Sequence, residues 1–315
     1  MLSPMGCTAA GRPWREAWDA ALYGPEGFFV RSAPTEHFRT SVSVPLFATA
    51  VRRLACLVDD ALGKPDPFDV VDLGAGRGEL LLALGTVPAR WRLTAVERAP
   101  DPGVGLTWSA SVPVVTGLLF ANEWLDNVPC DVLQEGRLVQ VSPTGGESLG
   151  DVAPPEVLAW AERWWPGRER VEVGLARDSA WTAAVAKVQR GLAVAVDFGH
   201  LAGSRRPTLT GYRSGRQVRP VPDGSCDITA LVALDACAAA TGARLLRQRE
   251  VLQALEIRTT LPLWGGDAST YARGLEVASQ ARTLLDPNGL GGFGWLVQTV
   301  GCADPLAGVS VTIGA

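Results

Sequence analysis

Short apolar runs rich in valine, leucine and alanine recur along the chain, and each ends in a polar residue. Four of them have the length and flanks of buried parallel strands: 68–73, 92–97, 114–122 and 192–198. In an open α/β sheet, ligands bind beyond the carboxyl ends of the strands. We therefore expect one crevice to be lined by the polar residues that close these runs: Asp72, Glu97, Asn122 with Glu123, and Asp197.

Helical patterns alternate with these runs, which predicts an α/β fold of the Rossmann-like kind. The helices are expected at 44–62, 78–84, 155–165, 179–190 (with Asp178 as its N-cap and Gly191 as its stop) and 229–242. Two regions lie outside the alternation. We expect residues 1–65 to form a helical N-terminal segment over the active site, and residues 138–177 to form a cap inserted into a core of residues 66–315.

Composition and charge narrow the classes of function. The 315 residues carry a net charge of −4, with 29 basic and 33 acidic side chains, so a nucleic-acid partner is not expected. No run of about 18 apolar residues predicts a membrane span, and the N-terminus lacks the pattern of a signal peptide. The six cysteines form no Cys-x-x-Cys pair and only two histidines are present, so no metal site is expected. A cytoplasmic protein is the resulting expectation.

A glycine-rich loop follows the first predicted strand. In Asp72-Leu-Gly74-Ala-Gly76-Arg-Gly78 the glycines have the spacing Gly-x-Gly-x-Gly, which is usual in S-adenosylmethionine (SAM) methyltransferases, whereas dinucleotide-binding loops have Gly-x-Gly-x-x-Gly. Glu97 ends the next strand, where an acid can accept hydrogen bonds from both ribose hydroxyls. Asp72 argues against a nicotinamide enzyme, because a pyrophosphate would meet its negative charge. A turn that only packs a helix on the sheet is the simpler alternative.

A second cluster of acids follows the third predicted strand. Glu123 and Asp126 are three residues apart, so in a turn or first helical turn they project to one side and could grip a cation. Asp197, followed by His200, ends the next strand and offers another carboxylate. Helix caps and solvated turn acids are the alternative interpretation.

These residues carry a resemblance to a known family. The segment 121–129, Ala-Asn-Glu-Trp-Leu-Asp-Asn-Val-Pro, resembles the "ANEFFDALP" segment of the MidA-like methyltransferases, a family that includes a mitochondrial complex I assembly factor reported as a protein arginine methyltransferase. Further matches lie between residues 23 and 301: Gly24-Pro25-x-Gly27-Phe28-Phe29 with Ser32 and Pro34, the glycine loop, 171–173 with Trp181, 197–199, 208–213, 227–230 and 291–293.

The resemblance implies a class I SAM-dependent methyltransferase that methylates arginine nitrogens of a protein or peptide. Glu123 and Asp126 would hold the guanidinium, whose forked donors match carboxylates, and Asp197 or His200 would take the proton. The implied SAM-binding residues are Asp72, Gly74, Gly76, Gly78, Glu97, Asn122 and Ser32. Two other functions stay open: a non-catalytic SAM-binding assembly factor and a nicotinamide-dependent oxidoreductase. A homodimer also stays open.

Three departures from the family pattern indicate a divergent subgroup. Phe28 stands where the family usually has an acid, and Leu231 where it often has histidine. Only sixteen residues separate Glu97 from Val114, too few for the helix and strand that normally follow the ribose acid. We therefore expect residues 106–108 to rebuild the adenine side of the pocket.

Overall fold

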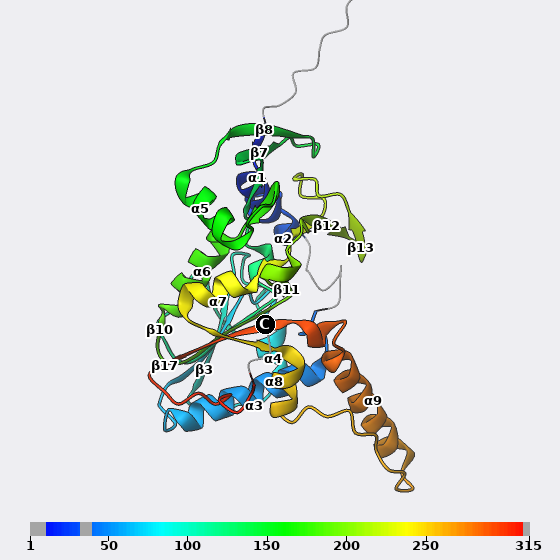
Figure 1. Cartoon of the computed structure of the whole chain (residues 1–315). Coiled ribbons are helices and arrows are strands. Elements are labelled where there is room, and N and C mark those ends of the chain that lie inside the picture. Colours follow the sequence, from blue (N-terminus) through cyan, green and yellow to red (C-terminus); the bar gives the residue numbers. More distant parts are fainter. Residues whose placement is uncertain (1–10, 32–39, 311–315) are drawn as a thin grey trace, which may run out of the picture. The chain divides into compact units, whose positions relative to one another are not determined.

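The computed structural model describes residues 11–31 and 40–310, and the chain divides into two compact units (Figure 1). The large unit comprises residues 39–125, 178–201 and 232–315, and the small unit comprises residues 1–38, 126–177 and 202–231. The predicted N-terminal segment contributes helices to both units. Its expected position over an active site, like that of the inserted cap, stays a prediction.

A seven-stranded, mostly parallel sheet forms the centre of the large unit, in the order β16-β17-β10-β5-β2-β3-β4. Only β17 runs against its neighbours. The strands are β2 Phe68–Leu73, β3 Trp91–Val96, β4 Thr107–Ser109, β5 Val115–Asn122, β10 Val188–Asp197, β16 Arg244–Arg247 and β17 Gly294–Val300. The four strands predicted from the apolar runs are confirmed as β2, β3, β5 and β10. Every residue of β2 and nearly every residue of β5 and β10 is buried, whereas only half of β3 is.

Helices and a small ladder complete the large unit. The elements are α3 Pro45–Ala61, α4 Glu79–Ala83, α6 Leu175–Val185 (whose first three residues belong to the small unit), α7 Leu234–Thr241, α8 Gln248–Ala254, α9 Ala268–Leu285 and η4 Leu290–Gly292, with β11 Gly199–His200 paired to β15 Val232–Ala233. The aromatic ring of Phe47 on α3 packs edge-on against Phe120 of β5 and Trp295 of β17. This cluster lies in the core that joins helix α3 to the sheet.

The small unit contains two antiparallel sheets. Its strands are β1 Arg12–Pro13, β6 Asp131–Gln134, β7 Arg137–Val141, β8 Glu147–Val152, β9 Arg170–Val173, β12 Thr210–Arg213, β13 Arg216–Val218 and β14 Asp227–Thr229. Its helices are α1 Trp14–Tyr23, α2 Phe28–Arg31, α5 Pro155–Trp164 and η3 Ala202–Ser204, and η2 Leu125–Asn127 leads into it from β5. The predicted helix at 155–165 is therefore confirmed as α5, and the region 138–177 also contains most of β7 together with β8 and β9.

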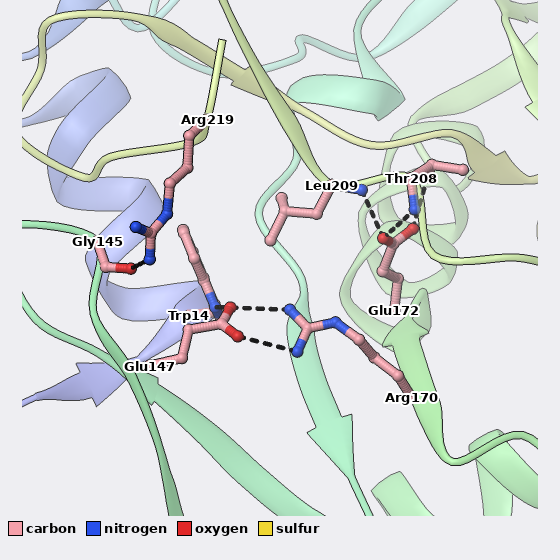
Figure 2. A network of polar contacts seen from close by, with 8 residues as sticks. All are labelled: Trp14, Gly145, Glu147, Arg170, Glu172, Thr208, Leu209 and Arg219. Carbon is pink, nitrogen blue, oxygen red and sulfur yellow. Dashed lines mark hydrogen bonds and ion pairs between the residues drawn. The ribbon is translucent and has the colours of Figure 1, made fainter.

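Polar contacts hold the small unit together (Figure 2). The Glu172 carboxylate on β9 accepts hydrogen bonds from the hydroxyl of Thr208 and the backbone N–H of Leu209, both at 2.6 Å. Arg170 forms a bidentate pair with Glu147, whose carboxylate also accepts from the Trp14 indole at 2.6 Å. Two segments of the family resemblance, 171–173 and 208–213, thus meet within this unit.

Two helix predictions need correction. Helix α6 begins at Leu175, so Asp178 lies inside it and is not its N-cap. Gly191 is not a helix stop, because it lies within β10, where pairing with β5 and β17 on both sides extends the strand back to Val188. Helix α7 begins at Leu234, five residues late, since Thr229 belongs to β14.

Two glycines face each other where β5 and β10 pair. Gly117 has φ +150° and Gly191 has φ +134°. A Cβ on Gly191 would lie 1.9 Å from the carbonyl oxygen of Gly117, and a Cβ on Gly117 would lie 2.1 Å from that of Asp69. The backbones of three central strands therefore approach too closely for any side chain at this level.

The short stretch between Glu97 and Val114 contains the strand β4 and no helix. The sequence predicted that this stretch is too short for the helix and the strand that normally follow the ribose acid. No helix forms there, but a strand does, because three residues suffice to pair with β3. Trp108 of β4 donates its indole N–H to the carbonyl of Ala99 at 3.0 Å. None of the described helices is long and apolar enough to cross a bilayer.

Candidate functional site

The loop that joins β2 to α4 is built from glycines in the left-handed region. Gly74, Gly76 and Gly78 have φ values of +77°, +59° and +85°, a conformation that side chains with a Cβ rarely adopt. A Cβ on Gly76 would meet only the carboxylate of Glu79, at 3.1 Å. Gly76 is therefore the position at which the loop leaves backbone uncovered by the rest of the chain, as a cofactor-binding turn requires.

The other two glycines are explained by packing within the large unit. A Cβ on Gly74 would lie 2.8 Å from the ring of Trp124, and a Cβ on Gly78 would lie 2.6 Å from Leu106. Leu106, which the sequence placed on the rebuilt side of the pocket, thus lies directly against the loop. The two neighbours fix the loop at the carboxyl ends of β2 and β3.

Glu97 holds the glycine loop to the end of β3. Its carboxylate accepts hydrogen bonds from the backbone N–H groups of Gly76 at 3.1 Å, Arg98 at 2.6 Å and Ala99 at 3.4 Å. A carboxylate offers about four acceptor positions, so these bonds leave room for a ligand hydroxyl. The structure brings Glu97 and the loop together, and its contact with a ribose stays a prediction.

Replacing Glu97 by alanine should weaken SAM binding by about 1–3 kcal/mol, the cost of leaving buried polar partners unpaired. The stability of the ligand-free protein should fall by less, because the three backbone donors lie near solvent. Calorimetric titration and urea unfolding measure the two quantities. Asp101→Ala is the matched control, since this exposed acid also accepts a backbone N–H, that of Gly103. Equal losses in binding and unfolding free energy would show that Glu97 is only structural.

Asp72 is the most perturbed acid beside the loop. It is 3% exposed, and burial, followed by repulsion from Glu97 and Glu79, raises its pKa to about 8. Among the described residues, no hydrogen-bond donor reaches this carboxyl group and no cation lowers its pKa. A positively charged ligand fits such a site, whereas a pyrophosphate does not.

Asn122 and Glu123 end β5 at the same edge of the sheet. Glu123 has φ +50°, an uncommon conformation for a residue with a side chain, and its N–H donates to the carbonyl of Val196 at 2.7 Å. Its carboxylate oxygen Oε1 accepts from the backbone N–H of Ser41 at 2.8 Å and from the Asn122 amide at 3.0 Å. The buried oxygen Oδ1 of Asn122 has no hydrogen-bond partner among the described residues, as expected of an atom that meets a ligand.

A buried polar network supports Ser41, and no motif in the sequence predicted it. The side-chain amide of Gln248 donates to the Ser41 hydroxyl at 3.1 Å and to the carbonyl of Leu290 at 2.9 Å, and its oxygen accepts from the Trp295 indole at 2.9 Å. Ser41, Gln248 and Trp295 are fully buried. Because 207 residues separate Ser41 from Gln248, only the folded chain reveals that they act together.

Asp197 is anchored by backbone groups at the end of β10. Its two carboxylate oxygens accept from the N–H of Leu125 and of Phe198, each at 2.9 Å, and the residue is 1% exposed. His200 is buried in β11. The bond from Leu125 ties Asp197 to the first residue of η2. The proton-accepting role of Asp197 and His200 stays a prediction.

Asp126 belongs to the small unit, where it forms a buried acid pair. Its carboxylate accepts from the Thr229 hydroxyl at 2.7 Å, and Asp227 accepts from the Asn127 amide at 3.1 Å. Burial raises the pKa of both acids, and the charge of Asp126 raises that of Asp227 further. Sequence reasoning missed Asp227 as an ionisable partner of Asp126.

Arg177 was also missed. Its buried guanidinium donates to the backbone carbonyls of Asp126, Val128, Ala230 and Leu231. The guanidinium therefore joins the segment after β5 to the segment after β14 within the small unit.

Two predictions about site residues are not tested by the structure. Glu123 and Asp126 fall in different units, so their joint binding of a substrate stays a prediction, and Ser32 lies outside the described residues. Among the described residues no group of histidine, cysteine and acid side chains is placed to hold a metal ion.

Comparisons with known proteins identify a family and a fold. Residues 89–249 match the model of a family described as "Putative S-adenosyl-L-methionine-dependent methyltransferase", and the match includes Glu97, Glu123 and Asp197. No curated protein matches the chain. Two crystal structures of COG1565 superfamily proteins from Burkholderia thailandensis share its fold, each with 23% identity. One, bound to S-adenosyl-homocysteine, has a TM-score of 0.75 over 94% of this chain and 90% of that one. The other has a TM-score of 0.71 over 93% and 88%.

Proposed function

Since the chain belongs to the family of S-adenosyl-L-methionine-dependent methyltransferases whose model covers residues 89–249, we propose that it methylates arginine side chains of a protein or peptide. The cofactor is SAM. The observation that carries the cofactor assignment is the buried, uncompensated Asp72 beside a loop whose backbone is bare at Gly76. The bound S-adenosyl-homocysteine of the Burkholderia protein supports it.

Three groups of the large unit are suited to hold SAM. The backbone at Gly76 allows close approach, Glu97 has acceptor capacity for ribose hydroxyls, and Asn122 offers an orphaned buried oxygen. When bound, SAM supplies a methyl group on a positively charged sulfur, which a nucleophile displaces in line. The protein then contributes mainly positioning and electrostatics.

Glu123 supports the arginine specificity. Its backbone, held in a strained conformation by the bond to Val196, and its bonds to Ser41 and Asn122 fix a carboxylate beside the carboxyl end of β5. A fixed carboxylate can orient the planar fork of a guanidinium better than the compact ammonium of lysine. The resemblance of residues 121–129 to MidA-like methyltransferases points to the same substrate.

SAM and S-adenosyl-homocysteine should raise the melting temperature of the protein, and NAD should not. A ligand at 100 times its Kd stabilises the folded state by about 2.7 kcal/mol, which thermal-shift assays detect readily. In Gly76→Val the shift should disappear, because a branched side chain occupies the bare backbone. Gly105→Val is the control, since Gly105 also has a positive φ, +80°, but no atom near its Cβ position. A shift with NAD alone would indicate the oxidoreductase.

The substrate is tested by incubating the purified chain with methyl-labelled SAM and a lysate of cells that lack the protein. Mass spectrometry then locates the label. We expect it on arginine nitrogens. Tight SAM binding without any transferred label would support a non-catalytic assembly factor, and label on another residue type would replace arginine as the substrate.

A further inference from the structure

A buried glutamine lies at the carboxyl edge of the central sheet. Gln248 directly follows β16, whose last residue, Arg247, is in register with Gly294 of β17. Gly294 is also in register with Asp197, the last residue of β10. Strands β10 and β5 are parallel, so Glu123, which directly follows β5, lies at the same edge as Gln248.

The partners of the Gln248 side chain require a primary amide. Its Oε1 accepts from the indole N–H of Trp295, which can only donate, and its Nε2 donates to the carbonyl of Leu290, which can only accept, both at 2.9 Å. Nε2 also donates to the hydroxyl of Ser41 at 3.1 Å. A carboxylate in this place would put an oxygen against the Leu290 carbonyl. These three contacts therefore fix the amide in one orientation.

Ser41 links this amide to the side chain of Glu123. Ser41 is fully buried in the turn that precedes α3, where its carbonyl accepts from the N–H of Val44 at 3.1 Å. Its own N–H donates to Oε1 of Glu123 at 2.8 Å. The bond from Gln248 thus fixes, through the Ser41 hydroxyl, the residue whose backbone bonds the acid.

The backbone of Glu123 is linked to the same amide by a second path. Its N–H donates to the carbonyl of Val196 at 2.7 Å, and Val196 is in register with Trp295. The indole of Trp295 in turn bonds Gln248. Because Glu123 has φ +50°, its conformation persists only where the surrounding structure fixes it. Both the backbone and the carboxylate of Glu123 therefore depend on contacts that meet at Gln248.

Resting on the proposed function, we infer that Gln248 is a positioning residue for methyl transfer, acting through Ser41 on the carboxylate of Glu123. Gln248 is fully buried, so it acts on an acceptor through other residues. A guanidinium fork requires a carboxylate held in one direction, and a displacement of about 1 Å can lower a rate by about 10²-fold. The contacts proposed for SAM at Gly76 and Glu97 involve none of the bonds of Gln248, so the affinity for SAM should not depend on it.

Ser41→Ala tests the link with the least disturbance, because it removes the hydroxyl that accepts from Gln248 and keeps the backbone. With saturating methyl-labelled SAM and the lysate of cells that lack the protein, the rate of label transfer to arginine should fall by about tenfold or more. The Kd of SAM should not change. Ser43→Ala is the matched control, since this exposed serine of the same turn donates its hydroxyl to the carbonyl of Thr40 at 2.6 Å. It should react at the parent rate.

Gln248→Met should lower the rate at least as far as Ser41→Ala, because it removes all three side-chain bonds of the amide. Val251→Ala is the control for a general loss of stability, since Val251 is fully buried in the hydrophobic core on the same helix. At a temperature at which circular dichroism shows each variant to be folded, Val251→Ala should react at the parent rate. An equal loss of rate in Val251→Ala would overturn the inference.

A double-mutant cycle shows whether the effect passes through Glu123. If it does, Ser41→Ala combined with Glu123→Gln should react no more slowly than Glu123→Gln alone, because the charge whose position matters is already absent. Losses of rate that multiply in the double variant would show independent effects, and the positioning role would be wrong.

Hydrogen exchange provides a measurement that needs no acceptor. In Gln248→Met the backbone N–H of Ser41 should exchange about tenfold faster than in the parent protein, because the turn opens more readily once its bond to the sheet edge is lost. Nuclear magnetic resonance measures this single amide. Unchanged exchange, or faster exchange with an unchanged transfer rate, would overturn the inference and leave the proposed function intact. A parent protein that transfers no label to arginine would overturn the proposed function and the positioning role with it.

Discussion

Replacing Glu123 by glutamine should lower the rate of methyl transfer by about 10² or more while SAM affinity persists. The amide keeps an oxygen for the N–H of Ser41, which the Glu123 carboxylate accepts at 2.8 Å, but loses the charge that localises a guanidinium. Loss of one electrostatic contact to the transition state has this magnitude. Single-turnover kinetics on an arginine peptide, together with the Kd of SAM, separate the two effects.

Glu276→Gln is the matched control for that variant, because this exposed glutamate on α9 only accepts a hydrogen bond from Gln280. It should react at the parent rate. A peptide with lysine in place of the target arginine should react poorly with the parent protein. If Glu123→Gln methylates at the parent rate, the arginine mechanism built on Glu123 is wrong.

A methyl group added at the centre of the sheet should have the largest effect on stability. Gly191→Ala should lower the free energy of unfolding by about 4 kcal/mol or more, because the new Cβ would lie 1.9 Å from the carbonyl oxygen of Gly117 at a φ of +134°. Neither β5 nor β10 can move aside, since each is paired on both edges. Urea unfolding of the soluble variant, or its failure to accumulate in soluble form, provides the measurement.

Gly265→Ala is the control for the effect of the substitution itself, because no atom lies within 4 Å of its Cβ position and its φ is not positive. It should change the free energy of unfolding by less than about 0.5 kcal/mol. A loss below about 1 kcal/mol in Gly191→Ala would mean that the central strands can separate enough to admit a side chain.

The parallel strands were predictable because their burial is continuous and leaves a simple mark in the sequence. Every residue of β2 is buried, and its predicted limits coincide with the observed ones. The antiparallel β17 and its partner β16 were not predicted, since their pairing depends on contacts made far along the chain. Gly191 was misinterpreted for the same reason: a glycine after a helical pattern usually ends a helix, and only the approach of Gly117 explains it.

The candidate site divides in a similar way. The glycine loop and the acids at the strand ends could be located from spacing, because chain direction places them at one edge of a parallel sheet. The hydrogen bonds that these residues make could not be predicted from spacing. Nothing in the sequence predicts a hydrogen-bond partner for the Glu123 carboxylate, yet Ser41 and Asn122 donate to it. Gln248 and Arg177 lie in no motif, and their roles arise from backbone groups distant in sequence.

The interleaved path of the chain has a consequence for its synthesis. Each unit is assembled from three separate stretches, so the chain passes between the units five times. Strand β10 is complete at residue 197, but β17, which covers one of its edges, ends only at residue 300. At about 5–20 residues per second, translation of the intervening stretch takes roughly 5–20 s. Throughout that interval the nascent protein carries an unpaired apolar strand edge, a template for misassociation with neighbouring chains on the same polysome.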